Sequence, residues 1–188
     1  KDTTFDLGSG FNGKIYTSLI QPDGKIILGG SFTTYNGSNA SRLIRLNADG
    51  SIDASFNTAI GVNTGIVYDL ALQPDGNIIV VGSFSKYNGV NANKIARVTP
   101  NGNLDTTFIT GSGASATVEE VQIQLDGKII LSGSFDSFNG ALNTVKIVRL
   151  NVGGDVDATF VSGYMLRTFW RFITSTPRDA SLTFVLNV

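Results

Sequence analysis

Residues 21–32 read Gln-Pro-Asp-Gly-Lys-Ile-Ile-Leu-Gly-Gly-Ser-Phe, and close copies of this stretch occupy residues 73–84 and 124–135. The second copy reads Gln-Pro-Asp-Gly-Asn-Ile-Ile-Val-Val-Gly-Ser-Phe, and the third reads Gln-Leu-Asp-Gly-Lys-Ile-Ile-Leu-Ser-Gly-Ser-Phe. The Asp-Gly pairs therefore recur at intervals of 52 and 51 residues. A repeat of about 50 residues is typical of propellers and solenoids. The sequence therefore predicts a chain of tandem structural units.

A second motif, Asp-x-x-Phe, marks the end of each unit. Its four copies begin at Asp2, Asp53, Asp105 and Asp157. These copies bracket three complete units, which cover about residues 6–56, 57–108 and 109–160. We therefore expect one three-repeat domain over residues 1–160. Residues 161–188 lack both motifs, and we expect them to form a divergent closing strand or an assembly segment.

Within each unit, the pattern predicts short strands separated by turns. Asp23 and Gly24 supply residues that accept the positive φ of a tight hairpin. The following Ile26-Ile27-Leu28 run has no polar face, as expected for a strand that is covered on both sides. With a turn every 8–12 residues and no helical period, the sequence predicts an all-β chain of antiparallel four-stranded blades of β-propeller type.

The composition excludes several kinds of chemistry. The chain has no Cys and no His, so it has no thiol nucleophile and lacks the commonest general base and transition-metal ligand. A net charge of −1 gives no field that would gather nucleic acid. No apolar run approaches the roughly 20 residues of a membrane span. We therefore expect no cofactor, metal, nucleic-acid partner or membrane span.

The Gln-Pro-Asp-Gly-Lys-Ile core, the Gly-Ser-Phe element and the Asp-x-x-Phe ending resemble the delta-60 repeat family over residues 2–160. This resemblance implies a β-propeller-like fold of the kind found in bacterial secreted or surface proteins and in phage-related genes. It carries no catalytic motif. On this basis we expect an extracellular, cell-surface or virion location.

Three units are too few for a closed propeller, since propellers typically have 4–8 blades. Three outcomes are open: the chain is part of a longer propeller, further chains complete the ring, or the stack remains open. An open stack leaves apolar blade faces in water at about 25 cal/mol per Å². We therefore favour a longer parent chain or an assembly with other copies.

The recurring charged residues have structural explanations. An aspartate present in every unit is expected to cap a turn through an Asx hydrogen bond, and the arginines at positions 45, 97 and 149 are expected to pair with these aspartates and pack between blades. The Asn47–Asp53 stretch offers too few carboxylates for calcium. Glu119 and Glu120 are adjacent on an expected strand and point to opposite faces, which argues against a glycosidase pair.

Polar turns that begin with an aromatic ring are the best candidates for ligand binding, because loops on rigid scaffolds carry function. The candidate ligand-binding residues are Tyr35, Asn36, Asn39, Tyr87, Asn88, Asn91, Phe138 and Asn139. The leading hypothesis is a non-enzymatic adhesin or receptor-binding module for a glycan or protein. The alternatives are a structural component of a fibre or particle and a propeller-based polysaccharide-acting enzyme.

Overall fold

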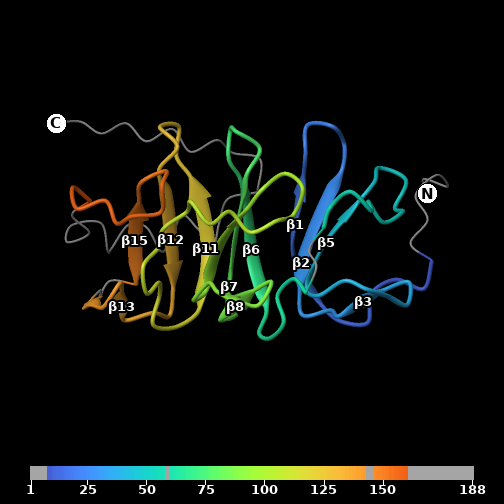
Figure 1. Cartoon of the computed structure of the whole chain (residues 1–188), viewed down its shortest axis with the longest axis horizontal. Helices are drawn as coiled ribbons and strands as arrows, with labels where there is room; N and C mark the ends of the chain where they lie inside the picture. Colours follow the sequence, from blue (N-terminus) through green and yellow to red (C-terminus); the bar gives the residue numbers. More distant parts are fainter. Residues whose placement is uncertain (1–7, 58–59, 143–145, 161–188) are drawn as a thin grey trace, which may run out of the picture.

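The computed structural model describes residues 8–57, 60–142 and 146–160, and all of its regular structure is β. None of the described segments forms a helix, and therefore none has the length and apolarity of a membrane-spanning helix. The closing segment that we expected over residues 161–188 lies outside the described residues. Each repeat folds into a three-stranded sheet with an attached two-stranded hairpin (Figure 1).

The three larger sheets are antiparallel and share one topology, in which the second strand lies in the middle. The first sheet comprises β1 (Ile15–Ile20), β2 (Ile26–Gly30) and β5 (Leu43–Leu46). The second comprises β6 (Val67–Leu72), β7 (Ile78–Gly82) and β10 (Ile95–Val98). The third comprises β11 (Val118–Ile123), β12 (Ile129–Gly133) and β15 (Ile147–Leu150). This arrangement confirms the predicted all-β, antiparallel, propeller-type fold.

The turn between the first two strands of each blade contains the predicted Asp-Gly pair. In the first repeat Gly24 has φ 82°, and its N–H donates to the carbonyl of Gln21 at 2.9 Å. The expected fourth strand of each blade is reduced to a single antiparallel bridge to the third strand. These bridges join Leu46 to Ile52, Val98 to Leu104 and Leu150 to Val156.

The segments expected as polar turns each contain a short hairpin. The three hairpins are β3 (Thr34–Tyr35) with β4 (Ser38–Asn39), β8 (Lys86–Tyr87) with β9 (Val90–Asn91), and β13 (Ser137–Phe138) with β14 (Ala141–Leu142). Figure 1 shows them along one edge of the molecule, with the Asp-Gly turns along the opposite edge.

The blades stack face to face, and this explains the apolar runs in their strands. In β7, Ile78 and Val80 belong to a core shared with the first blade, whereas Ile79 and Val81 belong to a core shared with the third. All four side chains are buried. A strand with no polar face is therefore the strand of a blade that is covered on both sides.

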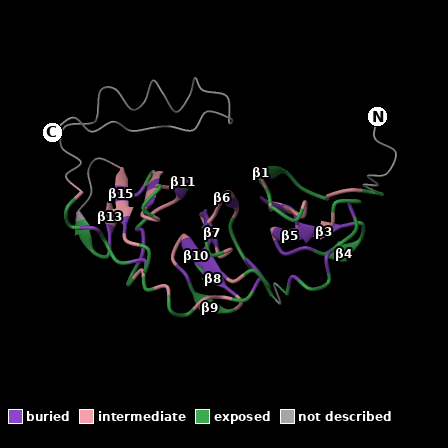
Figure 2. Ribbon diagram, turned by 90° about the horizontal axis from the view of Figure 1, so that it is seen from above, coloured by how far each residue is buried: buried purple, intermediate pink, exposed green. Residues whose placement is uncertain are grey.

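The innermost strands of the three blades are β1, β6 and β11, and they lie side by side on the concave side of an arc (Figure 2). Each contains a β-bulge at the same place, between Ile15 and Thr17, between Val67 and Asp69, and between Val118 and Glu120. The extra residue at each bulge is therefore Tyr16, Tyr68 or Glu119. A bulge redirects the extra side chain away from the regular pleat.

Candidate functional site

The repeated arginine of each blade is fixed by its own blade. In the first blade, Arg45 Nε lies 2.7 Å from Asp53 Oδ2, and the guanidinium lies over the Phe56 ring at 4.7 Å from its centroid. The same arrangement recurs in the other two blades, with Arg97, Asp105 and Phe108 and with Arg149, Asp157 and Phe160. We call each Arg–Asp–Phe set a corner. The predicted pairing of the repeated arginines with repeated aspartates is therefore present in all three blades.

Hydrogen bonds at the corners favour ionised aspartates. Burial would raise the pKa of Asp53, but hydrogen bonds from Ser55, Lys25 and Arg45 outweigh burial and hold that pKa well below its ordinary value. Hydrogen bonds from Thr159 and Lys128 likewise lower the pKa of Asp157. These carboxylates are strong acceptors engaged by cations and hydroxyl groups, so they are poor candidates for a general acid.

The second corner lacks the lysine found in the other two. Lys25 Nζ lies 3.0 Å from Asp53 Oδ2, and Lys128 Nζ lies 2.9 Å from Asp157 Oδ2. Asn77 stands at the lysine position of the second repeat and donates instead to Asp75. The pKa of Asp105 is still lowered, because hydrogen bonds from Thr107 and Arg97 outweigh the effect of burial.

The aspartates of the Asp-Gly turns cap those turns, as predicted. Asp23, Asp75 and Asp126 each accept the backbone N–H of the residue two positions later. In the Asn47–Asp53 stretch, Asp49 accepts the backbone N–H of Ser51 in the same way. Within the described ranges, no three acidic side chains gather as a metal ion would require.

Most of the side chains that we predicted as ligand-binding serve the fold. Tyr35, Tyr87 and Phe138 are buried, so these rings are not presented to a ligand at the surface as we had expected. The hydroxyl of Tyr35 donates to the carbonyl of Gly50 at 2.8 Å, and that of Tyr87 donates to Gly102 at 2.7 Å. The sequence places these rings in exposed turns, because the short hairpins that bury them leave no periodic signal.

The asparagines that follow these rings have a structural task too. Asn36, Asn88 and Asn139 adopt positive φ, and their Oδ1 atoms accept the backbone N–H groups of Gly10, Gly61 and Gly113. Asn39 and Asn91, on β4 and β9, are exposed. Ligand binding by these two residues stays a prediction.

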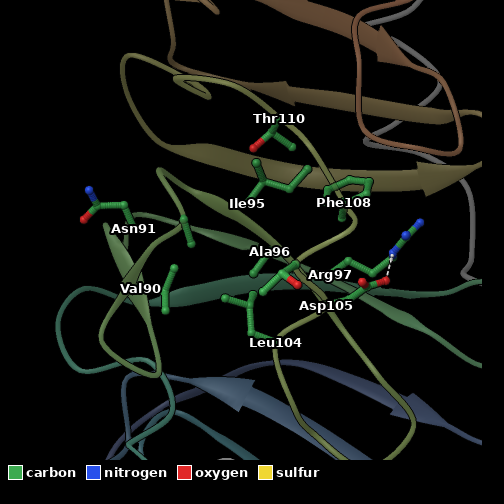
Figure 3. Close-up of a pocket in the computed structure, with 11 residues that line it drawn as sticks. Val90, Asn91, Ile95, Ala96, Arg97, Leu104, Asp105, Phe108 and Thr110 are labelled. Atoms are coloured by element: carbon green, nitrogen blue, oxygen red, sulfur yellow. Dashed lines mark hydrogen bonds and ion pairs between the residues drawn. The ribbon is translucent and has the colours of Figure 1, made fainter.

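A pocket of about 170 Å³ lies beside one of these exposed asparagines (Figure 3). Val90 and Asn91 form one side of it, and the segment around Phe108 forms the other. Arg97 and Asp105 also line it but are bonded to each other. Typical small-molecule sites measure about 300–1,000 Å³, so this pocket is small for a ligand site.

The bulge positions of the innermost strands stand out because Tyr16, Tyr68 and Glu119 are the extra residues in the pairing of their strands. Tyr16 and Glu119 are exposed and Tyr68 is half-buried. The rings of Tyr16 and Tyr68 meet edge to face at 5.2 Å between centroids. The aligned repeats do not single out these positions, because the residues that follow them also vary between the blades, as Thr17, Asp69 and Glu120 do.

The innermost strands also carry three carboxylates, Asp69 on β6 and Glu119 and Glu120 on β11. Asp69 accepts the hydroxyl of Thr17 at 3.1 Å and the backbone N–H of Val121 at 3.1 Å. Burial, together with the nearby charges of Asp69 and Glu119, raises the pKa of Glu120. We call Tyr16, Tyr68, Asp69, Glu119 and Glu120 the inner-strand patch. It contains two aromatic rings and three carboxyl groups on strands that line the concave side of the arc (Figure 2), and both oxygens of Asp69 already accept hydrogen bonds.

Comparison with solved structures gives a match to the crystal structure of a protein of unknown function from Bacteroides caccae, at 12% sequence identity and a TM-score of 0.40. The match covers 76% of this chain and 65% of that one, so the chain spans less than two thirds of its length. A comparison with curated proteins gives no match.

A family model matches each of the three repeats, at residues 21–56, 73–108 and 124–160. Each matched segment begins at the recurring Gln-x-Asp-Gly turn and ends at the phenylalanine of the corner, so the match covers each blade apart from its innermost strand. Together the matches cover more than half of the sequence. The chain therefore belongs to the β-propeller family described as a domain of unknown function, DUF5122.

Proposed function

We propose that this chain is a non-enzymatic binding module that recognises a glycan through the inner-strand patch. The observation that carries the proposal is the set of three equivalent bulges, which direct Tyr16, Tyr68 and Glu119 out of the regular pleat. A tyrosine ring supplies a rigid apolar face with a polar tip, and carboxylates accept hydrogen bonds from hydroxyl groups. Rings and carboxylates together suit a sugar, which presents C–H faces and hydroxyl groups.

The recurring charged groups are already bonded within the fold, and this favours a binding role over catalysis. The corner aspartates hold arginines, and the turn aspartates hold backbone N–H groups. Glu120 is half-buried, whereas its neighbour Glu119 is exposed at the bulge. The adhesin or receptor-binding role and the extracellular or virion location rest on the resemblance to the delta-60 repeat family, and they form part of this proposal.

A basic segment of a protein is the second candidate ligand. Three carboxyl groups lie close enough that Asp69 and Glu119 raise the pKa of Glu120. A lysine or arginine side chain would relieve this repulsion and would also be attracted to the tyrosine faces.

The test is a glycan array probed with the purified chain, run beside an array of lysine- and arginine-rich peptides. The double variant Tyr16→Ala/Tyr68→Ala should lose binding, whereas Asn39→Ala/Asn91→Ala on the hairpins should keep it. Thermal unfolding of both variants checks that the blades remain folded, since the ring pair is worth only about 0.5–1.5 kcal/mol. Retained binding in the tyrosine variant would overturn the proposal. Binding to basic peptides alone, abolished by Glu119→Gln, would establish the second candidate instead.

A further inference from the structure

The corner arginines of the first two blades reach into the blade that follows. Arg45 Nη1 donates to the carbonyl of Pro100 at 2.6 Å, and Arg97 Nη1 donates to the carbonyl of Val152 at 2.8 Å. Arg149 takes the same place in the third blade, where its Nη1 bonds to a glutamine of its own blade at 3.5 Å. Among the described residues, no carbonyl of another blade accepts from Arg149. The third blade therefore carries the donor of an inter-blade bond whose acceptor belongs to a further blade.

The innermost strands show the same pattern. Asp69 Oδ2 accepts the backbone N–H of Val121 in the following blade at 3.1 Å. Glu120 stands at the place of Asp69 in the third blade, and a hydrogen bond joins it to Ser132 within that blade. In the first blade, Ser18 stands at the place of Val121. Glu120 and Ser18 are therefore the two halves of a second contact of this kind.

The first blade also exposes apolar side chains that are covered in the other blades. Ile15 at the start of β1 is 45% exposed, whereas Val67 and Val118 at the same place are 0% exposed. Ile20 at the end of β1 is 73% exposed, whereas its counterpart Leu72 packs against the core that the first and second blades share. These counterparts are covered by the preceding blade.

The face of the third blade that points away from the second blade is also less buried than the same face of the other blades. Ile27 and Ile79 face the next blade and are fully buried, whereas Ile130 at the same place is half-buried. The end faces of the chain thus carry the two different sides of one interface, which the chain itself forms twice.

We infer that the third blade of one copy packs on the first blade of a second copy, and that two such contacts close a six-bladed ring. The two faces differ, so the contact is heterologous and can be repeated until a ring closes. Two copies give six blades, within the range of 4–8 found in propellers, and three copies would exceed it. In the ring, Arg149 would reach the carbonyl of Ala48, which stands at the place of Pro100, and Glu120 would accept from Ser18.

Light scattering across a dilution series measures the number of copies directly. The expected mass is twice the 19.9 kDa of one chain. Ile15→Asp should give the mass of one chain, because it places a charge in the contact. Val90→Asp, at a residue 50% exposed on hairpin strand β9, is the matched control and should keep the doubled mass. A single-chain mass for the unaltered protein at every concentration, or an unlimited assembly, would overturn the ring.

Cysteine pairs test the direction of the contact, since the chain has no Cys of its own. A mixture of Ser18→Cys and Glu120→Cys chains should form a disulfide-linked pair under mild oxidation, whereas neither variant alone should do so. The outcome distinguishes the head-to-tail contact from a symmetric one, in which Ser18→Cys alone would link to itself. Cross-linking of either variant alone, to the same yield as in the mixture, would refute the proposed geometry. This test does not depend on any ligand.

Discussion

The Arg45–Asp53 corner and the bulge at Tyr16 belong to the same blade but differ in whether their residues recur in the other two blades. The corner has the same arginine, aspartate and phenylalanine in all three blades, with each arginine and aspartate bonded within the structure. The bulge has the same backbone in all three blades but carries Tyr, Tyr and Glu. At the corner, repetition accompanies a structural task, whereas at the bulge a constant backbone presents a tyrosine in two blades and a glutamate in the third.

Acid should have the largest effect on stability, because it acts on all three corners together. The folded-state pKa values of Asp53, Asp105 and Asp157 lie below the ordinary value. Their contribution is therefore present above the unfolded pKa of about 3.9 and is lost as the pH falls below it. Urea unfolding at a series of pH values should show the midpoint falling steeply below about pH 4.

The titration of Glu120 changes stability in the opposite direction and over a higher pH range. Because its folded-state pKa is raised, it favours folding below its unfolded pKa of about 4.3, and this contribution is lost at higher pH. Repeating the series with Glu120→Gln removes this contribution and should leave the loss below pH 4 unchanged. A midpoint that stays constant between pH 5 and 2 would contradict the assignment of low pKa values to the corners.

A single broken corner should have the next largest effect. Asp53→Ala leaves the Arg45 guanidinium buried without its carboxylate, since the side chains are only 6% and 7% exposed. Removal of one partner of a buried pair costs about 3–5 kcal/mol. Asp23→Ala is the control, because that side chain is 57% exposed and 3.9 Å from Lys25, and it should cost about 1 kcal/mol or less. Equal free energies of unfolding for the two variants would count against the structural role of the corner.

Much of this fold could be predicted from the sequence because its signals are local and occur three times. The Asp-Gly turns determine where β1 and β2 meet, and the Ile26-Ile27-Leu28 run indicates a strand covered on both faces. The prediction failed at the hairpins, where strands of two residues are too short to show alternation. Tyr35 is buried because β3 pairs with β4 and bridges back to Phe11, a contact that no nearby pattern indicates.

The candidate site was harder to predict than the fold. The recurring charged residues have the structural contacts predicted for them, because a residue present in every blade is expected to do the same task in each. Tyr16 and Tyr68 are not among the predicted ligand-binding residues, because the alternation expected of a strand does not indicate a bulge. A β-bulge adds one residue without a consistent sequence signature, so only the register of β1 against β2 shows that the tyrosine is the extra residue.

Removal of one buried hydroxyl should have an intermediate effect. Tyr87→Phe leaves the carbonyl of Gly102, which Tyr87 bonds at 2.7 Å, without its donor, and a buried unpaired group costs about 1–3 kcal/mol. The third blade allows a hydroxyl to be added instead of removed. There Phe138 stands at the place of Tyr87, and Gly154 stands at the place of Gly102. Phe138→Tyr should therefore gain about 0.5–1.5 kcal/mol in the free energy of unfolding. If Tyr87→Phe unfolds at the same urea concentration as the unaltered protein, the hydroxyl does not contribute.

The smallest expected effect tests whether the three corners are equivalent apart from one residue. Asn77→Lys places an ammonium where Lys25 and Lys128 approach their aspartates at 3.0 and 2.9 Å. These lysines are 30% exposed, so the gain should be at most about 1 kcal/mol and should decrease as salt is added. Lys25→Asn is the matched control and should lose a similar amount with the same salt dependence. Suppose that Lys25→Asn lowers the free energy of unfolding while Asn77→Lys fails to raise it. In that case the second corner differs from the other two by more than the missing lysine, and its backbone must hold Asp105 in a different position relative to residue 77.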